Sequence, residues 1–137
     1  MKKVAVILAD GFEEIEALTS VDVLRRAGAI ASIASLKDAQ IRGAHNISVK
    51  ADVTLREVEE LGYDAIVLPG GLPGAENLAN DAKLREILQE FDKKGKLICA
   101  ICAAPMVLER ARVLKEHFVC YPGFEEKFWM ITQKVKL

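Results

Sequence analysis

Residues 96–105 have the sequence KLICAICAAP, and residues 64–71 have the sequence DAIVLPGG. Each stretch contains a short, uninterrupted apolar run, which is typical of a strand buried on both faces of a parallel sheet. The first run is followed by Pro105, a residue favoured in the first turn of a helix, and the second run stops at a Pro-Gly-Gly turn. We therefore expect two neighbouring strands, one ending in a helix start and the other in a glycine loop.

The rest of the chain continues this alternation of strands and helices. Thr54 and Glu57 form a capping box for a short helix, while Asp81 and Gly95 are suited to begin and end a longer one. Repeated strand–helix units predict an α/β domain, with a mostly parallel sheet between two layers of helices. The expected strands are 3–9, 30–36, 64–68, 96–101 and 118–120, the expected helices are 13–27, 81–94 and 103–112, and 40–50 form a hairpin.

The composition indicates one domain, residues 1–137, with reduced thiols. The net charge of −1 gives no electrostatic reason to bind nucleic acid or an acidic membrane. The apolar start stops at Asp10 without a small-residue cleavage site, so a strand is the better interpretation than a signal peptide. No apolar run is long enough to cross a membrane. Three cysteines do not make a secreted disulfide framework, so we expect a cytoplasmic protein.

Cys102 is the first candidate for chemistry. It follows a predicted buried strand and precedes a predicted helix, with the small residues Ala100 and Ala104 on either side, as the tight turn of a nucleophile elbow requires. The positive end of the helix dipole and nearby N–H donors would lower the pKa of this thiol and favour the thiolate. The alternative is an unreactive core cysteine, because free cysteines are often buried.

The other two cysteines are weaker candidates. Cys99 and Cys102 form a C-x-x-C string, but Cys99 lies inside the predicted strand and no second ligand pair is present. A metal site or a redox dithiol is therefore disfavoured. We assign Cys120 to packing.

Two further segments follow strand ends and would lie near Cys102. The glycines of Pro69-Gly70-Gly71 could direct N–H groups at an anion, as in a phosphate loop, or could simply form a turn; Gly71 beside Cys102 could hold an oxyanion. The helix 13–27 begins with acidic residues, of which Glu16 either points into the crevice as a proton donor or complements the helix dipole on a solvated face. Its apolar side is expected to contain Ile15, Leu18, Val21, Val23 and Leu24.

Four ordered motifs resemble the ThiJ/PfpI family. They are DGFEEIE at 10–16, VDVLRRAG at 21–28, LPGGLPGAENL at 68–78 and ICAAP at 101–105, and the resemblance runs from residue 3 to residue 124. It implies a flavodoxin-like three-layer sandwich, related to the class I glutamine amidotransferases, and usually a homodimer. It further implies that Cys102 is the nucleophile, that Glu16 is its protonated carboxyl partner, and that Gly71 and Ala103 supply backbone N–H groups.

The chain departs from the family pattern near the site. PfpI-type peptidases carry a histidine directly after the cysteine, where this chain has Ala103, so the resemblance favours the deglycase branch over a peptidase. Some members of that branch have a histidine at the position of Tyr121, which we expect to line the site together with Gly70. His45 and His117 occupy no matching position, and we place His117 at the surface.

The second departure is the tail, residues 125–137. It lacks the strand-turn and the closing helix with which the family usually continues. We expect the apolar residues Phe128, Trp129, Met130 and Ile131 to cover part of the core, in the same subunit or in a partner.

The resemblance predicts a cysteine-dependent enzyme of the deglycase or glyoxalase III-like class. Its substrate would be a small carbonyl compound, an α-oxoaldehyde, or a side chain modified by one, and no metal or organic cofactor is implied. The alternatives are a redox-sensing or chaperone-like stress protein that uses oxidation of Cys102, and a protease- or amidase-like or inactive binding domain. We expect a homodimer or a larger homo-oligomer.

Overall fold

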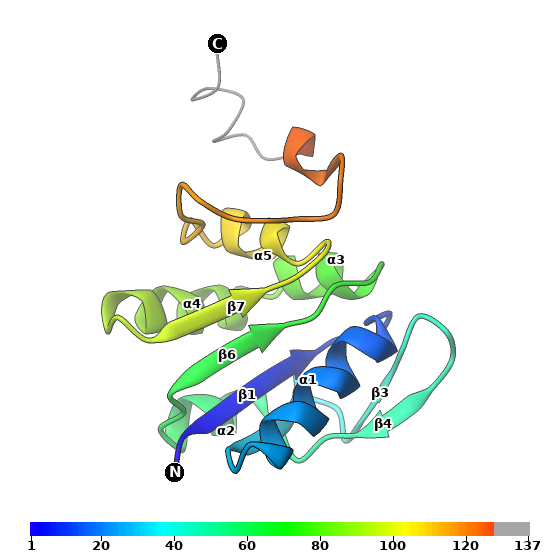
Figure 1. Ribbon diagram of the computed structural model, residues 1–137, viewed down its shortest axis with the longest axis vertical. Coiled ribbons are helices and arrows are strands. Elements are labelled where there is room, and N and C mark those ends of the chain that lie inside the picture. Colours follow the sequence, from blue (N-terminus) through cyan, green and yellow to red (C-terminus); the bar gives the residue numbers. More distant parts are fainter. Residues whose placement is uncertain (128–137) are drawn as a thin grey trace.

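The computed structural model describes residues 1–127. Five parallel strands form the central sheet in the order β5-β2-β1-β6-β7, and β3 and β4 form a separate antiparallel hairpin (Figure 1). The strands are β1 (Lys3–Leu8), β2 (Ile30–Ser35), β3 (Gln40–Arg42), β4 (Ser48–Lys50), β5 (Val53–Thr54), β6 (Ala65–Leu68) and β7 (Leu97–Ala100). The helices are α1 (Glu14–Arg26), α2 (Leu55–Glu60), α3 (Gly74–Ala79), α4 (Ala82–Lys93) and α5 (Pro105–Arg110), followed by a 3₁₀ turn, η1 (Phe124–Lys127).

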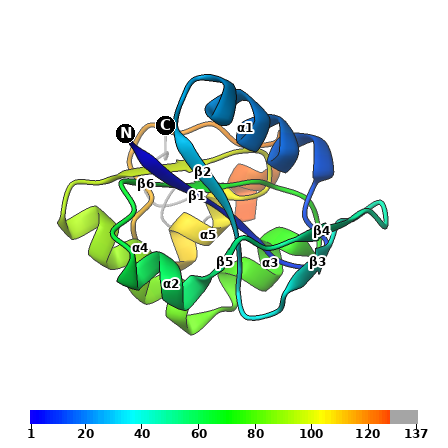
Figure 2. The ribbon, with the colours of Figure 1, turned by 90° about the horizontal axis from the view of Figure 1, so that it is seen from below.

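Helices cover the two faces of the sheet unequally. Figures 1 and 2 show α1 on one face and α2 to α5 on the other, which confirms the predicted α/β sandwich. The α1 side buries Leu8 and Ile33 against Phe12, Ala17 and Val21. The opposite side holds the larger apolar cluster, to which β1, β6 and all four helices of that layer contribute.

Most predicted elements are present, with two local corrections. Residues 118–120, expected as a strand, have no strand geometry, and α3, which begins at Gly74, was not expected. Glycine and proline at 70–74 conceal that short helix because both residues disfavour helical structure in the middle of a segment. The predicted helix starts at Thr54 and Asp81 are confirmed by their caps.

The predicted apolar side of α1 is also partly wrong. Ile15 is 75% exposed and Val23 is 57% exposed, whereas Glu14, Ala17 and Val21 are buried. The buried stripe therefore begins with a carboxylate, because the loop after β3 closes over Glu14.

Strand β7 lies at the edge of the sheet, and its side chains are exposed or only partly buried. On the α1 side its residues Leu97 and Ile101, the latter just after the strand, are 63% and 48% exposed. On the other side Ile98 and Ala100 pack against the large core cluster. No helix among residues 1–127 is long and apolar enough to cross a membrane. The predicted packing of Trp129 and its neighbours lies outside the described residues.

Candidate active site

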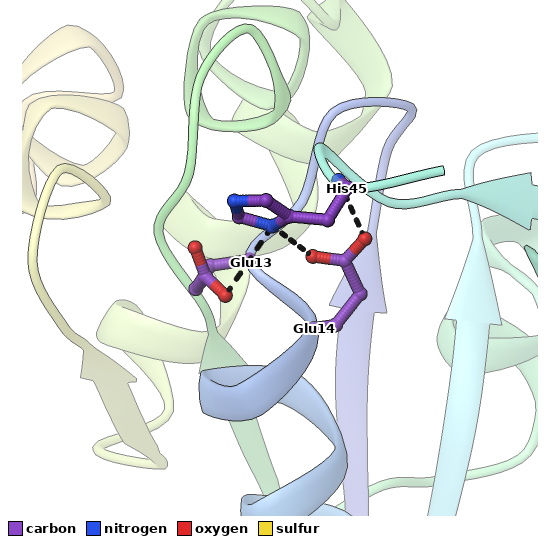
Figure 3. A group of neighbouring side chains, drawn as sticks. All are labelled: Glu13, Glu14 and His45. Carbon is purple, nitrogen blue, oxygen red and sulfur yellow. Dashed lines mark hydrogen bonds and ion pairs between the residues drawn. The ribbon is translucent and has the colours of Figure 1, made fainter. Parts of the chain in front are cut away.

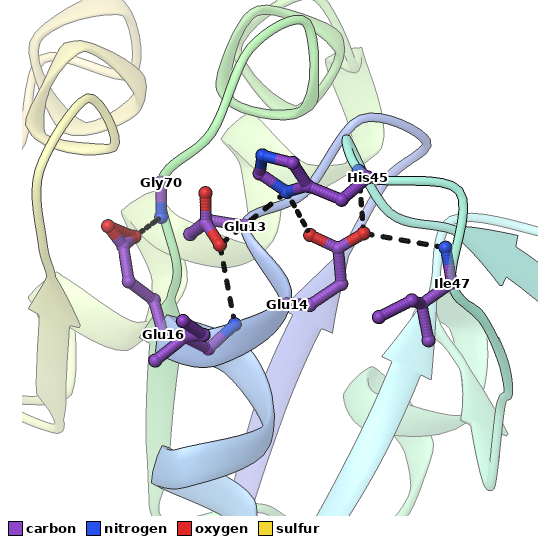
Figure 4. Close-up of polar contacts among 7 residues, drawn as sticks. Glu13, Glu14, Glu16, His45, Ile47 and Gly70 are labelled. Atoms are coloured by element: carbon purple, nitrogen blue, oxygen red, sulfur yellow. Dashed lines mark hydrogen bonds and ion pairs between the residues drawn. The ribbon is translucent and has the colours of Figure 1, made fainter.

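Three chain segments meet where β6 and β7 end. The loop after β6 contains Gly70 and Gly71, the turn after β7 contains Cys102, and the first turn of α1 contains Glu16. The Gly70 N–H donates a hydrogen bond of 2.8 Å to Oε2 of Glu16 (Figure 4). The Gly70 carbonyl accepts one of 2.9 Å from the Glu13 N–H. These two bonds fix the start of α1 against the glycine loop, at the strand ends where parallel sheets bind ligands.

Gly70 is the point at which the predicted site residues converge. A Cβ placed on Gly70 would lie 2.8 Å from the Cys102 Cβ, 2.9 Å from Glu16 Oε2 and 3.0 Å from the Ala103 N. Only glycine leaves room for these three groups at once. The structure thus brings together the residues that the sequence placed on three separate segments.

The backbone at Cys102 has the strained geometry of a nucleophile elbow. Cys102 has a φ of 62° although it is not a glycine, a conformation that L-residues rarely adopt. Ala103 and Ala104, the next two residues, are buried, so larger side chains would not fit there. Such strain holds the sulfur at the top of the sheet, and strained residues of this kind cluster at functional sites.

The pKa of the Cys102 thiol is raised above its usual range, contrary to the expectation from the sequence. Partial burial is the largest cause, followed by the hydrogen bond with Glu16 and its negative charge. Hydrogen bonds from the Ala103 and Gly71 N–H groups act in the opposite direction. The helix α5 begins at Pro105, three residues after Cys102, and has six residues.

The Glu16 carboxylate therefore acts directly on the Cys102 thiol. Its hydrogen bond to the thiol and its negative charge both oppose ionisation of the sulfur. Once ionised, the thiolate would face the Ala103 and Gly71 N–H donors.

The backbone of Tyr121, which the resemblance places at the edge of the site, lies beside Cys102. Its backbone N–H donates a hydrogen bond of 2.8 Å to the Cys102 carbonyl. Its ring is 57% exposed and meets Phe124 edge to face, with centroids 6.0 Å apart. The segment around residue 121 thus continues the edge of the site without forming a strand.

A second cluster of titratable side chains, which the sequence did not predict, is formed by Glu13, Glu14 and His45 at the start of α1. His45 Nδ1 is 2.8 Å from Glu14 Oε2 and 3.8 Å from Glu13 Oε1 (Figure 3). Burial of the Glu14 carboxylate opposes ionisation, but hydrogen bonds from His45 and Ile47 outweigh it and lower its pKa to about 2. The pKa of His45 is raised, first by its bond to Glu14 and then by the charges of both glutamates.

This group fastens the hairpin to the start of α1. The backbone N–H of His45 donates a 2.7 Å hydrogen bond to Glu14 Oε1, and the nearby Gly43 leaves no room for a Cβ beside the Glu14 side chain. Among residues 1–127 it is the only set of three acidic, histidine or cysteine side chains with atoms close enough for one metal ion. Only the folded hairpin brings His45 there, which is why no local sequence pattern revealed the contact.

The remaining cysteines and His117 stay outside the site. Cys99 lies within β7, and its pKa is raised by burial. The Cys120 thiol donates a 3.5 Å hydrogen bond to Glu125 Oε2. His117 is exposed, as predicted.

The sequence model of the DJ-1/PfpI family matches residues 2–135. The chain belongs to the DJ-1/PfpI family. This confirms the resemblance of the four motifs, and the central parallel sheet has the arrangement of DJ-1 structures. The solved structure of oxidized Toxoplasma gondii DJ-1 is similar, with a TM-score of 0.89 and 42% identity, covering 96% of this chain and 73% of that one.

Several curated members of the DJ-1/PfpI family are also similar in sequence. Protein DJ-1alpha of Drosophila melanogaster is 40% identical over 97% of this chain, and a deglycase of Pyrococcus abyssi is 33% identical over 90%. Protein DJ-1 homolog B of Arabidopsis thaliana is 40% identical over 92%. The chain spans 64% of the Drosophila protein, 75% of the Pyrococcus protein and 30% of the Arabidopsis protein.

Proposed function

We propose that this protein is a cysteine-dependent enzyme that acts on α-oxoaldehydes or on side chains modified by them. The observation that carries the proposal is the contact of one sulfur with a carboxyl group and two backbone N–H donors. The deglycase among the similar proteins supports the same substrate class. The proposed chemistry needs neither a metal nor an organic cofactor, and we place it in the cytoplasm, where thiols stay reduced.

The first step is addition of the thiolate to the aldehyde carbon. The sulfur lone pair forms the S–C bond, and the electrons of the C=O π bond move to oxygen. The Gly71 and Ala103 N–H groups stabilise the developing oxyanion. The proton that left the thiol for Glu16 then returns to this oxygen, which gives a neutral hemithioacetal and a Glu16 carboxylate.

Turnover of methylglyoxal by purified protein tests this proposal. Cys102→Ser should reduce the rate to background, while Cys120→Ser, a matched change outside the site, should leave it unchanged. Glu16→Gln keeps a hydrogen-bonding group but cannot carry the proton, so the rate should fall by roughly 10²–10⁴-fold, as for loss of a general acid–base group. Equal turnover by wild type and Cys102→Ser would refute the proposal.

We propose redox sensing by the same sulfur as the second candidate. The N–H donors that would hold an oxyanion can equally hold a sulfinate, and one similar structure is of an oxidized DJ-1. Each peroxide molecule transfers one oxygen to sulfur and leaves as water, first giving a sulfenic acid and then a sulfinic acid. Intact-mass analysis after mild peroxide should show the gain of two oxygens in wild type and none in Cys102→Ser. Oxidation without methylglyoxal turnover would favour this second function.

A further inference from the structure

A second hollow lies at the carboxyl ends of β1 and β2, apart from Cys102. Its volume is about 360 Å³, within the range of small-molecule sites. Cys102, Glu16 and Gly71 do not line it. In Figure 2, the hairpin β3–β4 and helix α3 both lie at the end toward which β1 runs. Its polar lining residues are Asp10, Ser35, Lys37, Asp38, Asn77 and Asp81, with Gln40 beside them.

Ser35 is the unusual residue of this hollow. It is 1% exposed, and its Oγ is the one buried side-chain oxygen or nitrogen of the described residues without a hydrogen-bond partner. Ser32, on the same strand and also buried, accepts a 2.7 Å hydrogen bond from the Tyr63 hydroxyl. A buried hydroxyl without a partner is destabilising, and because Ser35 lines the hollow, a ligand bound there is a candidate to supply that partner.

The charge of the lining selects the kind of ligand. The lining contains three carboxylates, Asp10, Asp38 and Asp81, and one ammonium group, Lys37. Asp10 and Asp81 each use one oxygen for a backbone N–H, of Arg42 and Leu84 respectively. Asp38 makes no hydrogen bond or ion pair with the residues that the structure describes. The lining is therefore rich in acceptors that a cation with several N–H groups can satisfy.

The spacing of these carboxylates argues against a single metal ion. Within the described part of the chain, no three carboxylates at this hollow come within 4.8 Å of one another; only the Glu13, Glu14 and His45 group does. Charges that are spread around a hollow suit an extended organic cation, whose donors are separated by several bonds.

We propose that this hollow binds a small organic cation, an amine or guanidinium compound, with one donor reaching Ser35. The site is independent of the chemistry at Cys102. A ligand there would rest against Asp10, one residue from Gly11, which packs against the loop that contains Gly71.

Agmatine, which carries an ammonium and a guanidinium group, is the probe for calorimetric titration. A matched control is 4-guanidinobutanoate, in which a carboxylate replaces the ammonium group. Agmatine should bind saturably and the control much more weakly. In NMR spectra, the shifted amides should be confined to residues 8–10, 35–41 and 77–81.

Variants make the assignment specific. Ser35→Ala should weaken agmatine binding by roughly 2–10-fold, the range for one neutral hydrogen bond. Without ligand it should unfold at the same or a higher temperature, because it removes an unpartnered hydroxyl. Asp38→Asn should weaken binding further. Asp22→Asn, which removes the ion pair between Asp22 and Arg26 on α1 and does not touch the hollow, should leave binding unchanged.

Cys102→Ser should bind agmatine like wild type, which separates this proposal from the catalytic one. The proposal is overturned if agmatine fails to bind at millimolar concentration, if the control binds equally well, or if Ser35→Ala and Asp38→Asn bind like wild type. Saturable binding of Ca²⁺ alone at the same amides, without agmatine binding, would equally overturn it.

Discussion

The strands β1 and β7 have similar apolar sequences but very different surroundings. The five residues from Val4 to Leu8 are almost completely buried between α1 and the helices of the other face. In β7 the first residue, Leu97, is 63% exposed, and Ile98, Cys99 and Ala100 are only partly buried. A continuous apolar run therefore indicates a strand without showing that both of its faces are covered. The site joins these two regions, because Glu16 belongs to the covered half and Cys102 follows the open edge.

The largest expected difference between the two regions is in stability. Leu8→Ala removes a fully buried side chain and should reduce the free energy of unfolding by about 2–5 kcal/mol. Leu97→Ala removes a mostly exposed one and should change it by less than about 0.5 kcal/mol. Urea unfolding followed by circular dichroism measures both. A cost for Leu97→Ala close to that of Leu8→Ala would mean that another chain or segment covers the edge in solution.

We propose that the exposed apolar face of β7, which contains Leu97 and is continued by Ile101, mediates association into a homodimer or larger homo-oligomer. Exposed apolar patches of this kind often mark contacts with other chains. Leu97→Lys with Ile101→Lys should shift the protein toward the monomer in light scattering, while Ile15→Lys, an equally exposed apolar site on α1, should not. A monomeric wild type would contradict this part of the account.

Substitutions of Gly70, after β6, and of Gly95, before β7, should differ in their effect on activity. Gly70→Ala would push a Cβ against Cys102 and Glu16, and a displacement of about 1 Å at such a site can cost about 10²-fold in rate. Gly95→Ala, before β7, has open space around its Cβ but a φ of +65°. It should lower stability slightly and leave the rate constant of the folded protein unchanged. Methylglyoxal turnover with both variants, normalised to folded protein, provides the comparison.

The smallest expected effect is the pH dependence of the contact between Glu14 and His45. The pKa of His45 is raised, so its stabilising contribution is complete below the ordinary histidine value of about 6.5 and is lost as pH rises through the raised value. The pKa of Glu14 is about 2, so its contribution is present above 4.5 and lost as pH falls through about 2.

Stability between about pH 6 and about pH 9 should therefore decline slightly more in wild type than in His45→Gln. His117→Gln, at an exposed histidine, should retain the wild-type profile. Identical profiles for all three proteins would show that the ion pair does not contribute in solution.

The sequence predicted the features that depend on neighbouring residues. The strands up to β7, the caps at Thr54 and Asp81, and the turn at Cys102 each depend on local residue preferences, and the structure contains them, whereas the expected strand 118–120 is absent. The sequence placed Glu16, the glycine loop and Cys102 at one edge of the sheet through the rule for ligand sites in parallel sheets, but it did not predict the hydrogen bond from Gly70 to Glu16.

The missed features depend on long-range packing. Glu14 is buried because the loop at Gly43 to His45 folds over it, although its place in the sequence suggests a solvated helix start. The pKa of Cys102 is raised because burial and Glu16 outweigh the hydrogen bonds from the Ala103 and Gly71 N–H groups. Helix propensity and dipole arguments take account of neither effect.

The effect of the Glu16 carboxylate on the Cys102 thiol is tested most directly by the pH dependence of Cys102 alkylation. Peptide mass analysis would follow iodoacetamide labelling of Cys99, Cys102 and Cys120 separately, in wild type and in Glu16→Gln. Removing the carboxylate charge should lower the pKa of Cys102, so Glu16→Gln should be alkylated faster at neutral pH even though its turnover is slower. Labelling of Cys99 and Cys120 should not change. An unchanged or slower alkylation of Cys102 in Glu16→Gln would show that the Glu16 carboxylate does not oppose ionisation of the Cys102 thiol.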